Sequence, residues 1–159
     1  MVRRWWIGGF AVVLLLQQTP SWAIGIALRF VDVTLENVQP GASFNLRAIK
    51  NLPMVVQNLD HEEGVDIVLE SVLPNVKDPK EMKDGYEPIP DPSWVRIFPD
   101  HFHLGPHASA ASDILVTVPN DPKLIGHHFK CILAARTDKK VNRLMQNGVI
   151  IQADRKSVV

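Results

Sequence analysis

The sequence predicts an all-β fold, an antiparallel sandwich of about seven or eight strands. Apolar residues recur with period two in several short segments, which is the pattern of strands that bury one face. The chain has 12 prolines and 9 glycines, and many of them mark turns between those segments. No window beyond the first 23 residues carries the apolar stripe of a helix. A small barrel is the alternative architecture that the same pattern allows.

The N-terminus has the organisation of a secretory signal peptide. Two arginines precede an apolar run at 5–16, and small residues stand at Ser21 and Ala23, before the expected cleavage point. The run is shorter than the roughly 20 residues of a membrane span, and an uncleaved anchor is the alternative. We therefore predict a cleaved signal peptide at 1–23 and a single exported domain at 24–159, periplasmic or extracellular.

Composition narrows the functional classes. Removing residues 1–23 takes away two of the 17 basic residues and none of the 17 acidic ones, so the mature chain is close to neutral. It lacks the basic stripe of a nucleic-acid binder. No second apolar stretch of spanning length follows, which predicts no membrane span after cleavage. Cys131 is the single cysteine, so no intramolecular disulfide can form, and we expect it to be a small core residue.

In the first half of the domain, apolar alternation predicts strands at 26–35, 44–48, 53–58 and 65–69. Within the first of these, the inward-facing parity changes between Phe30 and Val31, as a bulge in one strand would produce. Pro40 and Gly41 form a turn signal before the second. We interpret the acidic segment 60–64 as a hairpin turn between the third and fourth.

In the second half, strands are expected at 94–98, 114–118, 127–136 and 148–152. The segment 99–107 between the first two is expected to be a bend at which the chain crosses from one sheet to the other. Alternation with polar neighbours, or a following proline, predicts four core residues: Trp94, Val116, Phe129 and Leu133.

Residues 74–92 do not show the apolar alternation of the predicted strands. Loops of this length in a compact domain are usually functional or mobile. The charged part at 77–87 should be solvated, and the prolines that follow favour extended polyproline geometry. The loop is either a stiff crossover or a recognition loop. In the second case its binding residues are Tyr86, Pro88, Ile89, Pro90 and Pro92, with Tyr86 as the aromatic anchor.

Three histidines are weak candidates for a metal site. His101 and His103 share a face if their segment is extended, and His107 follows closely. Spacing alone supplies no further ligand, so surface and turn histidines are the simpler interpretation. The chain has no nucleophile elbow, no zinc-protease motif and no phosphate-binding glycine loop. We predict no catalytic residue and no cofactor; a histidine-based periplasmic metal-binding protein is the alternative function.

Six segments resemble the strand-and-proline layout of bacterial extracytoplasmic immunoglobulin-like domains: 52–58, 65–74, 94–99, 102–106, 114–119 and 120–135. The layout is similar to that of periplasmic pilus-chaperone N-terminal domains and of cell-envelope immunoglobulin-like modules. The resemblance implies a Greek-key, immunoglobulin-like sandwich without an active site. It also implies a non-enzymatic module, structural or chaperone-like, that binds another envelope protein or a second copy through an edge strand.

Overall fold

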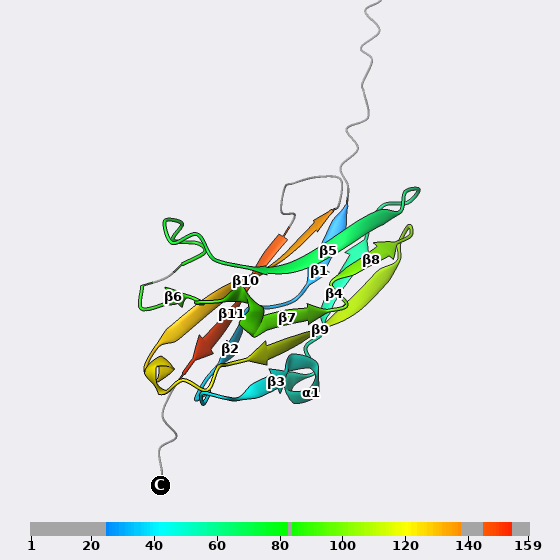
Figure 1. Ribbon diagram of the computed structural model, residues 1–159. Coiled ribbons are helices and arrows are strands. Elements are labelled where there is room, and N and C mark those ends of the chain that lie inside the picture. The colour runs from blue at the N-terminus through cyan, green and yellow to red at the C-terminus, as the bar shows by residue number, and fades with distance from the viewer. Residues whose placement is uncertain (1–24, 83, 138–144, 154–159) are drawn as a thin grey trace, which may run out of the picture.

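The computed structural model describes residues 25–82, 84–137 and 145–153, in which two β-sheets make up almost the whole body (Figure 1). The predicted signal peptide and its cleavage point lie outside the described residues. The all-β sandwich predicted from the apolar alternation is confirmed, because strands on both sheets bury one face against a shared core.

The first sheet is antiparallel throughout. Its strands are β1 (Ile26–Arg29), β3 (Ser43–Asn45), β4 (Met54–Asn58), β7 (Val95–Phe98) and β9 (Ser109–Thr117). The long strand β9 pairs with three of the others. It pairs with β4 near its start, with β3 near its end, and with β7 along its other side, while β1 extends the sheet beyond β4.

The second sheet is mixed. Its strands are β2 (Val33–Leu35), β5 (Val65–Val72), β6 (Glu87–Pro88), β8 (His101–Leu104), β10 (His128–Thr137) and β11 (Met145–Gln152). The order β2-β11-β10-β5-β8 includes a parallel β2–β11 pair, and β6 also runs parallel to β10. The predicted antiparallel sandwich therefore has two short parallel pairs in its second sheet.

The helices are short. They are α1 (Leu46–Lys50) and the 3-10 turns η1 (Pro92–Trp94) and η2 (Pro122–Leu124). Within the described part of the chain, no helix has the length and apolar character to cross a membrane.

The core lies between the two sheets. The four predicted core residues are confirmed: Trp94, Val116, Phe129 and Leu133 are all buried. The rings of Trp94 and Phe129 meet edge to face with centroids 5.5 Å apart, a favoured aromatic geometry. Cys131 is also fully buried, as expected, and this burial raises the pKa of its thiol from 9.0 to about 12.

Two predicted local features are wrong in the same way, because the chain changes sheet where a turn or bulge was expected. The parity change between Phe30 and Val31 is not a bulge, since β1 pairs with β4 in the first sheet and β2 pairs with β11 in the second. Segment 60–64 is not a hairpin turn, since it joins β4 of the first sheet to β5 of the second. The predicted sheet-crossing bend after Phe98 is confirmed, although residues 101–104 form strand β8 rather than an irregular bend.

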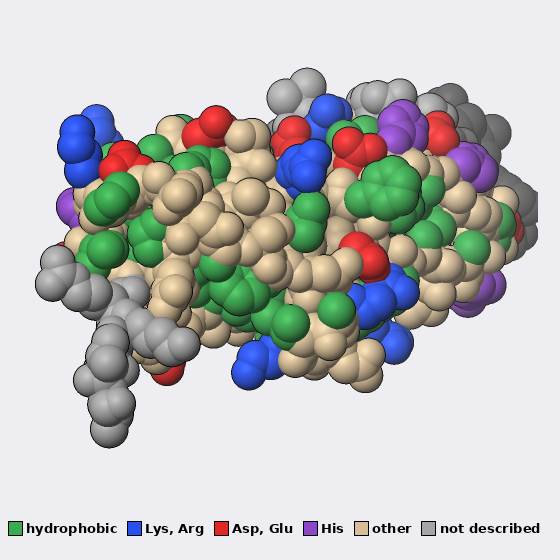
Figure 2. Space-filling view, turned by 60° about the horizontal axis from the view of Figure 1, so that its bottom comes forward, with side chains coloured by type: hydrophobic (Ala, Val, Ile, Leu, Met, Phe, Trp, Pro, Cys, Tyr) green, Lys and Arg blue, Asp and Glu red, His purple; other side chains and the backbone are tan. Residues whose placement is uncertain are grey.

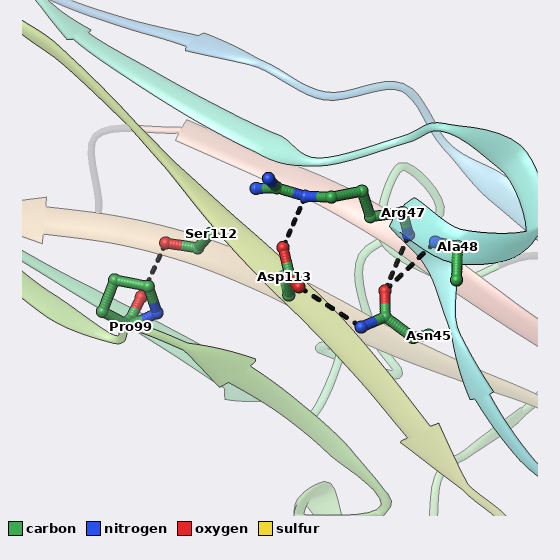
Figure 3. Close-up of polar contacts among 6 residues, drawn as sticks. All are labelled: Asn45, Arg47, Ala48, Pro99, Ser112 and Asp113. Carbon is green, nitrogen blue, oxygen red and sulfur yellow. Dashed lines mark hydrogen bonds and ion pairs between the residues drawn. The ribbon is translucent and has the colours of Figure 1, made fainter.

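Strand 44–48 is also corrected, because the chain turns into α1 after Asn45. The Asn45 side-chain oxygen accepts hydrogen bonds from the backbone N–H groups of Arg47 and Ala48, which caps the helix. Its amide nitrogen donates to Asp113 on β9, and Arg47 forms an ion pair with the same carboxylate (Figure 3). The neighbouring Ser112 hydroxyl donates to the carbonyl of residue 99, at 2.6 Å. The contacts of Asn45 and Arg47 with Asp113 attach α1 to β9.

Candidate functional site

The connection between β5 and β6 is the largest departure from the sandwich, and we call residues 73–86 the β5–β6 loop. Strand β5 pairs with β10 up to Val72, and β6 pairs with the same edge of β10 from Glu87. The chain thus leaves this edge and returns to it a few residues further along β10. In Figure 1 the loop extends beyond the end of β5.

Hydrogen bonds within the β5–β6 loop give it a defined shape. Glu81 accepts a bond from the backbone N–H of Asn75 at 2.7 Å. The Asp78 side chain accepts one from the N–H of Lys80 at 2.9 Å, and its carbonyl accepts from Met82 at 2.8 Å. Side-chain acceptors of this kind stabilise turns locally. The charged half of the loop is therefore folded, where the sequence suggested only a solvated segment.

Two apolar side chains are exposed on this loop. Leu73 is 48% exposed and Val76 is 61% exposed, on either side of the buried Pro74. Exposed apolar side chains that lie near each other in the sequence, on one loop, are candidates for an interaction surface. Neither residue was singled out from the sequence, because Leu73 looked like the end of a strand and Val76 like an isolated residue among charges.

The five predicted binding residues have different environments. Tyr86 is partly buried, with its ring centroid 6.0 Å from that of His128. Pro88 belongs to β6, Pro90 is exposed, and Pro92 starts η1 while its carbonyl accepts a bond from the Ser71 hydroxyl.

Ile89 is the exception among them, because it lies in the core. It is 1% exposed, and its N–H donates to the carbonyl of Lys130 at 2.9 Å. A side chain buried in this way cannot contact a partner while the domain is folded. The contact surface considered below therefore leaves Ile89 out.

The β5–β6 loop also covers part of the second sheet. On β10, Phe129 and Cys131 face the core, so Lys130 and Ile132 point to the opposite face. Both are nevertheless buried, at 7% and 3% exposed. They line a cavity together with loop residues 78, 80 and 81, which shows that the loop folds over the outer face of β10.

The three candidate metal-binding histidines do not form a cluster. His101 and His103 are both exposed on β8, and the Nδ1 atom of His103 lies 2.8 Å from the Asp66 carboxylate. His107 has a positive φ of 55° and its ring meets that of His61 at a centroid distance of 4.4 Å. Among the described residues, no three or more His, Cys, Asp or Glu side chains are arranged to hold a metal ion.

A small cavity of about 50 Å³ lies near the segment that joins β4 to β5. The fully buried Asn58 lines it, and the Asn58 amide donates to the carbonyls of Glu63, Leu104 and Gly105. The hydroxyl of Thr137, which also lines the cavity, is buried and has no hydrogen-bond partner among the described residues. A cavity of this size has room for water, which would supply that bond.

Charge is mixed on the face of the molecule that Figure 2 shows. On the face drawn in Figure 2, acidic and basic side chains of the described residues lie next to one another and hydrophobic side chains are scattered between them. This agrees with the near-neutral composition and gives that face no extended field of one sign.

Comparison with known proteins supports the fold. No protein-family model matches the chain, and no curated protein matches it. A proposed carbohydrate binding protein from Bacteroides ovatus is similar with a TM-score of 0.59 at 11% identity, over 82% of this chain and 37% of its own. A family 123 glycoside hydrolase from Clostridium perfringens gives 0.52 at 10% identity, over 82% and 27%. The E. coli chaperone DraB gives 0.47 at 12% identity, over 82% and 55%.

These likenesses concern the fold alone. The chain spans well under half the length of the first two proteins, so their whole-protein properties do not transfer to it. The immunoglobulin-like β-sandwich implied by the sequence resemblance is confirmed.

Proposed function

We propose that this chain is a non-catalytic, exported immunoglobulin-like module that binds another cell-envelope protein through its β5–β6 loop. The observation that carries the proposal is the exposure of Leu73 and Val76 on a loop that is internally hydrogen-bonded. A surface that already holds its bound shape loses little conformational entropy on docking. Tyr86 and Pro90 lie further along the same connection and extend the contact surface.

The structural and chaperone-like roles that we expected share this mode of action. In each, the module contributes a stable sandwich and a loop that a partner recognises. Similarity to a bacterial chaperone and to carbohydrate-related proteins is compatible with a binding role and names no partner. Location in the periplasm or outside the cell follows in this proposal from the predicted signal peptide at 1–23.

The test replaces both exposed apolar side chains of the loop. The double variant Leu73→Ser, Val76→Ser should keep the melting temperature of the parent, because neither side chain packs in the core. Recovery of envelope proteins crosslinked to the exported domain should fall, because the apolar contact is lost. Recovered proteins would be quantified by mass spectrometry against the parent.

The chain offers a matched control elsewhere on its surface. Ile49 and Val31 are 48% and 60% exposed, close to the values for Leu73 and Val76, and they lie on α1 and on the β1–β2 connection. The double variant Ile49→Ser, Val31→Ser should leave recovery unchanged. Equal recovery by the parent and the loop variant would show that the loop is not the binding surface.

A further inference from the structure

A second candidate site lies beneath the β5–β6 loop, in a cavity of about 270 Å³. Lys130 and Ile132 of β10 and Gly148 of β11 form its floor. Lys130 is only 7% exposed, yet its side chain makes no hydrogen bond or ion pair with any residue that the structure describes. Lysines this buried usually have a partner. The Nζ atom of Lys130 is not among the fully buried atoms without a partner, so the ammonium is accessible from the cavity. The ammonium is thus a free donor on the cavity wall.

The strand below the cavity is shaped to admit this lysine. A Cβ atom at position 148 would lie 3.0 Å from Cε of Lys130 and 3.4 Å from a carboxylate oxygen of Asp32. Glycine inside a strand weakens it and often marks a place where another group approaches closely. Gly148 therefore provides the space for both side chains, and its N–H donates to the Asp32 carboxylate at 2.6 Å.

The loop supplies the roof with Asp78, Lys80 and Glu81. The hydrogen bonds that shape the loop use one oxygen of Asp78 and one of Glu81. The second oxygen of each carboxylate accepts no hydrogen bond from the described residues. The roof therefore offers acceptors, while the floor offers the Lys130 donor.

We propose that this cavity binds a small zwitterion, a compound of amino-acid size that carries one anionic and one cationic group. The lining contains two ammonium groups and three carboxylates: Lys80, Lys130, Asp32, Asp78 and Glu81. A simple anion would meet three like charges, and a simple cation would meet the ammonium of Lys130. A zwitterion places its anionic group on Lys130 and its cationic group against the roof carboxylates. The volume is just below the roughly 300–1,000 Å³ of pockets for drug-sized ligands, which suits a smaller compound.

The proposal does not depend on the protein-binding function of the loop, and its test uses the purified protein alone. Free α-amino acids would be titrated into it by calorimetry and thermal shift, with sodium acetate and methylammonium chloride as single-charge controls. At least one amino acid should bind saturably and raise the melting temperature, as any ligand specific for the folded state does. Each control salt should bind at least about tenfold more weakly, a difference of about 1.4 kcal/mol.

Lys130→Met removes the ammonium and keeps a chain of similar volume. It should reduce amino-acid binding at least about tenfold while the melting temperature stays close to that of the parent, because the apolar stem of the side chain is kept. Lys123→Met, at an exposed position on η2, is the matched control and should bind like the parent. Gly148→Ala is a second test. It keeps Lys130 but adds a methyl group to the floor of the cavity, and it should also weaken amino-acid binding.

Three results would overturn the proposal: no saturable binding by any amino acid, acetate binding as well as the amino acids do, or undiminished binding by Lys130→Met.

Discussion

Truncation of Leu133 tests the assignment of the core most directly. Leu133 lies at the centre of β10, is fully buried, and has β5 on one side and β11 on the other. Leu133→Ala removes three buried carbon atoms at a position where both neighbouring strands limit collapse of the cavity. Such substitutions cost about 2–5 kcal/mol. For a domain of this size that corresponds to a fall in melting temperature of about 3–5 °C per kcal/mol.

The assay is urea unfolding of the parent and the variant, with the shift in midpoint converted at an unchanged m-value. Leu73→Ala is the matched control, because it makes the same chemical change at a side chain that is 48% exposed on the β5–β6 loop. It should cost less than about 0.5 kcal/mol. If Leu133→Ala costs as little as Leu73→Ala, then Leu133 does not face the core and the register of β10 is misassigned.

Three further predictions concern the N-terminus, the cysteine and the helix cap. The exported protein should begin at Ile24, which intact-mass measurement decides; retention of 1–23 would contradict the signal peptide. Cys131 should resist a thiol reagent at pH 8 until the domain is unfolded. Because burial raises the pKa of its thiol to about 12, stability should fall as pH rises above about 9, where the unfolded thiol ionises first; a flat profile there would contradict the burial. Asn45→Ala should destabilise the domain by about 0.5–2 kcal/mol in urea unfolding through loss of the α1 cap, and Asn45→Ser should recover most of it.

Most of the fold could be predicted from alternation, because alternation reports which residues face a core. The pattern located β4, β5, β7, β9, β10 and β11 and identified Trp94 and Leu133 as core residues. Alternation carries no information about which sheet a strand joins. A parity change looks the same whether a strand bulges or leaves one sheet for the other, so the switch between β1 and β2 was interpreted as a bulge. For the same reason the 60–64 segment was mistaken for a hairpin turn.

Short elements escaped prediction for a different reason. Phe44, Leu46 and Ala48 satisfy a two-residue period, but in α1 only Leu46 of the helical residues is buried. A helix of one turn is too short to display a 3.6-residue stripe, and the capping role of Asn45 was the only sequence signal for it. Ile89 was misplaced because its neighbours are prolines. Their spacing suggested an exposed arm, whereas β6 is held to β10 and carries Ile89 into the core.

The candidate site depends on pairing between distant segments, which the sequence does not reveal. From the sequence, Gly148 is only the start of the predicted strand 148–152, and Lys130 is one residue within the predicted strand 127–136. The structure brings them together with Asp32, from the β1–β2 connection, and with the β5–β6 loop. A glycine directly before the β-branched run 149–151 was the one available signal, because strand interiors rarely contain glycine without a close contact.

The sheet edges bear on how a partner is recognised. The strands at the described edges are β1, β3 and β7 in the first sheet and β2, β6 and β8 in the second, and none is longer than four residues. Short edge strands are one way in which proteins prevent unwanted strand addition. Strand addition to these edges would gain few hydrogen bonds, so self-association through an edge strand has little support from this architecture. The β5–β6 loop is folded, and the strands at its two ends, β5 and β6, both pair with β10. It exposes the apolar side chains of Leu73 and Val76, so a partner is expected to bind there rather than at a sheet edge.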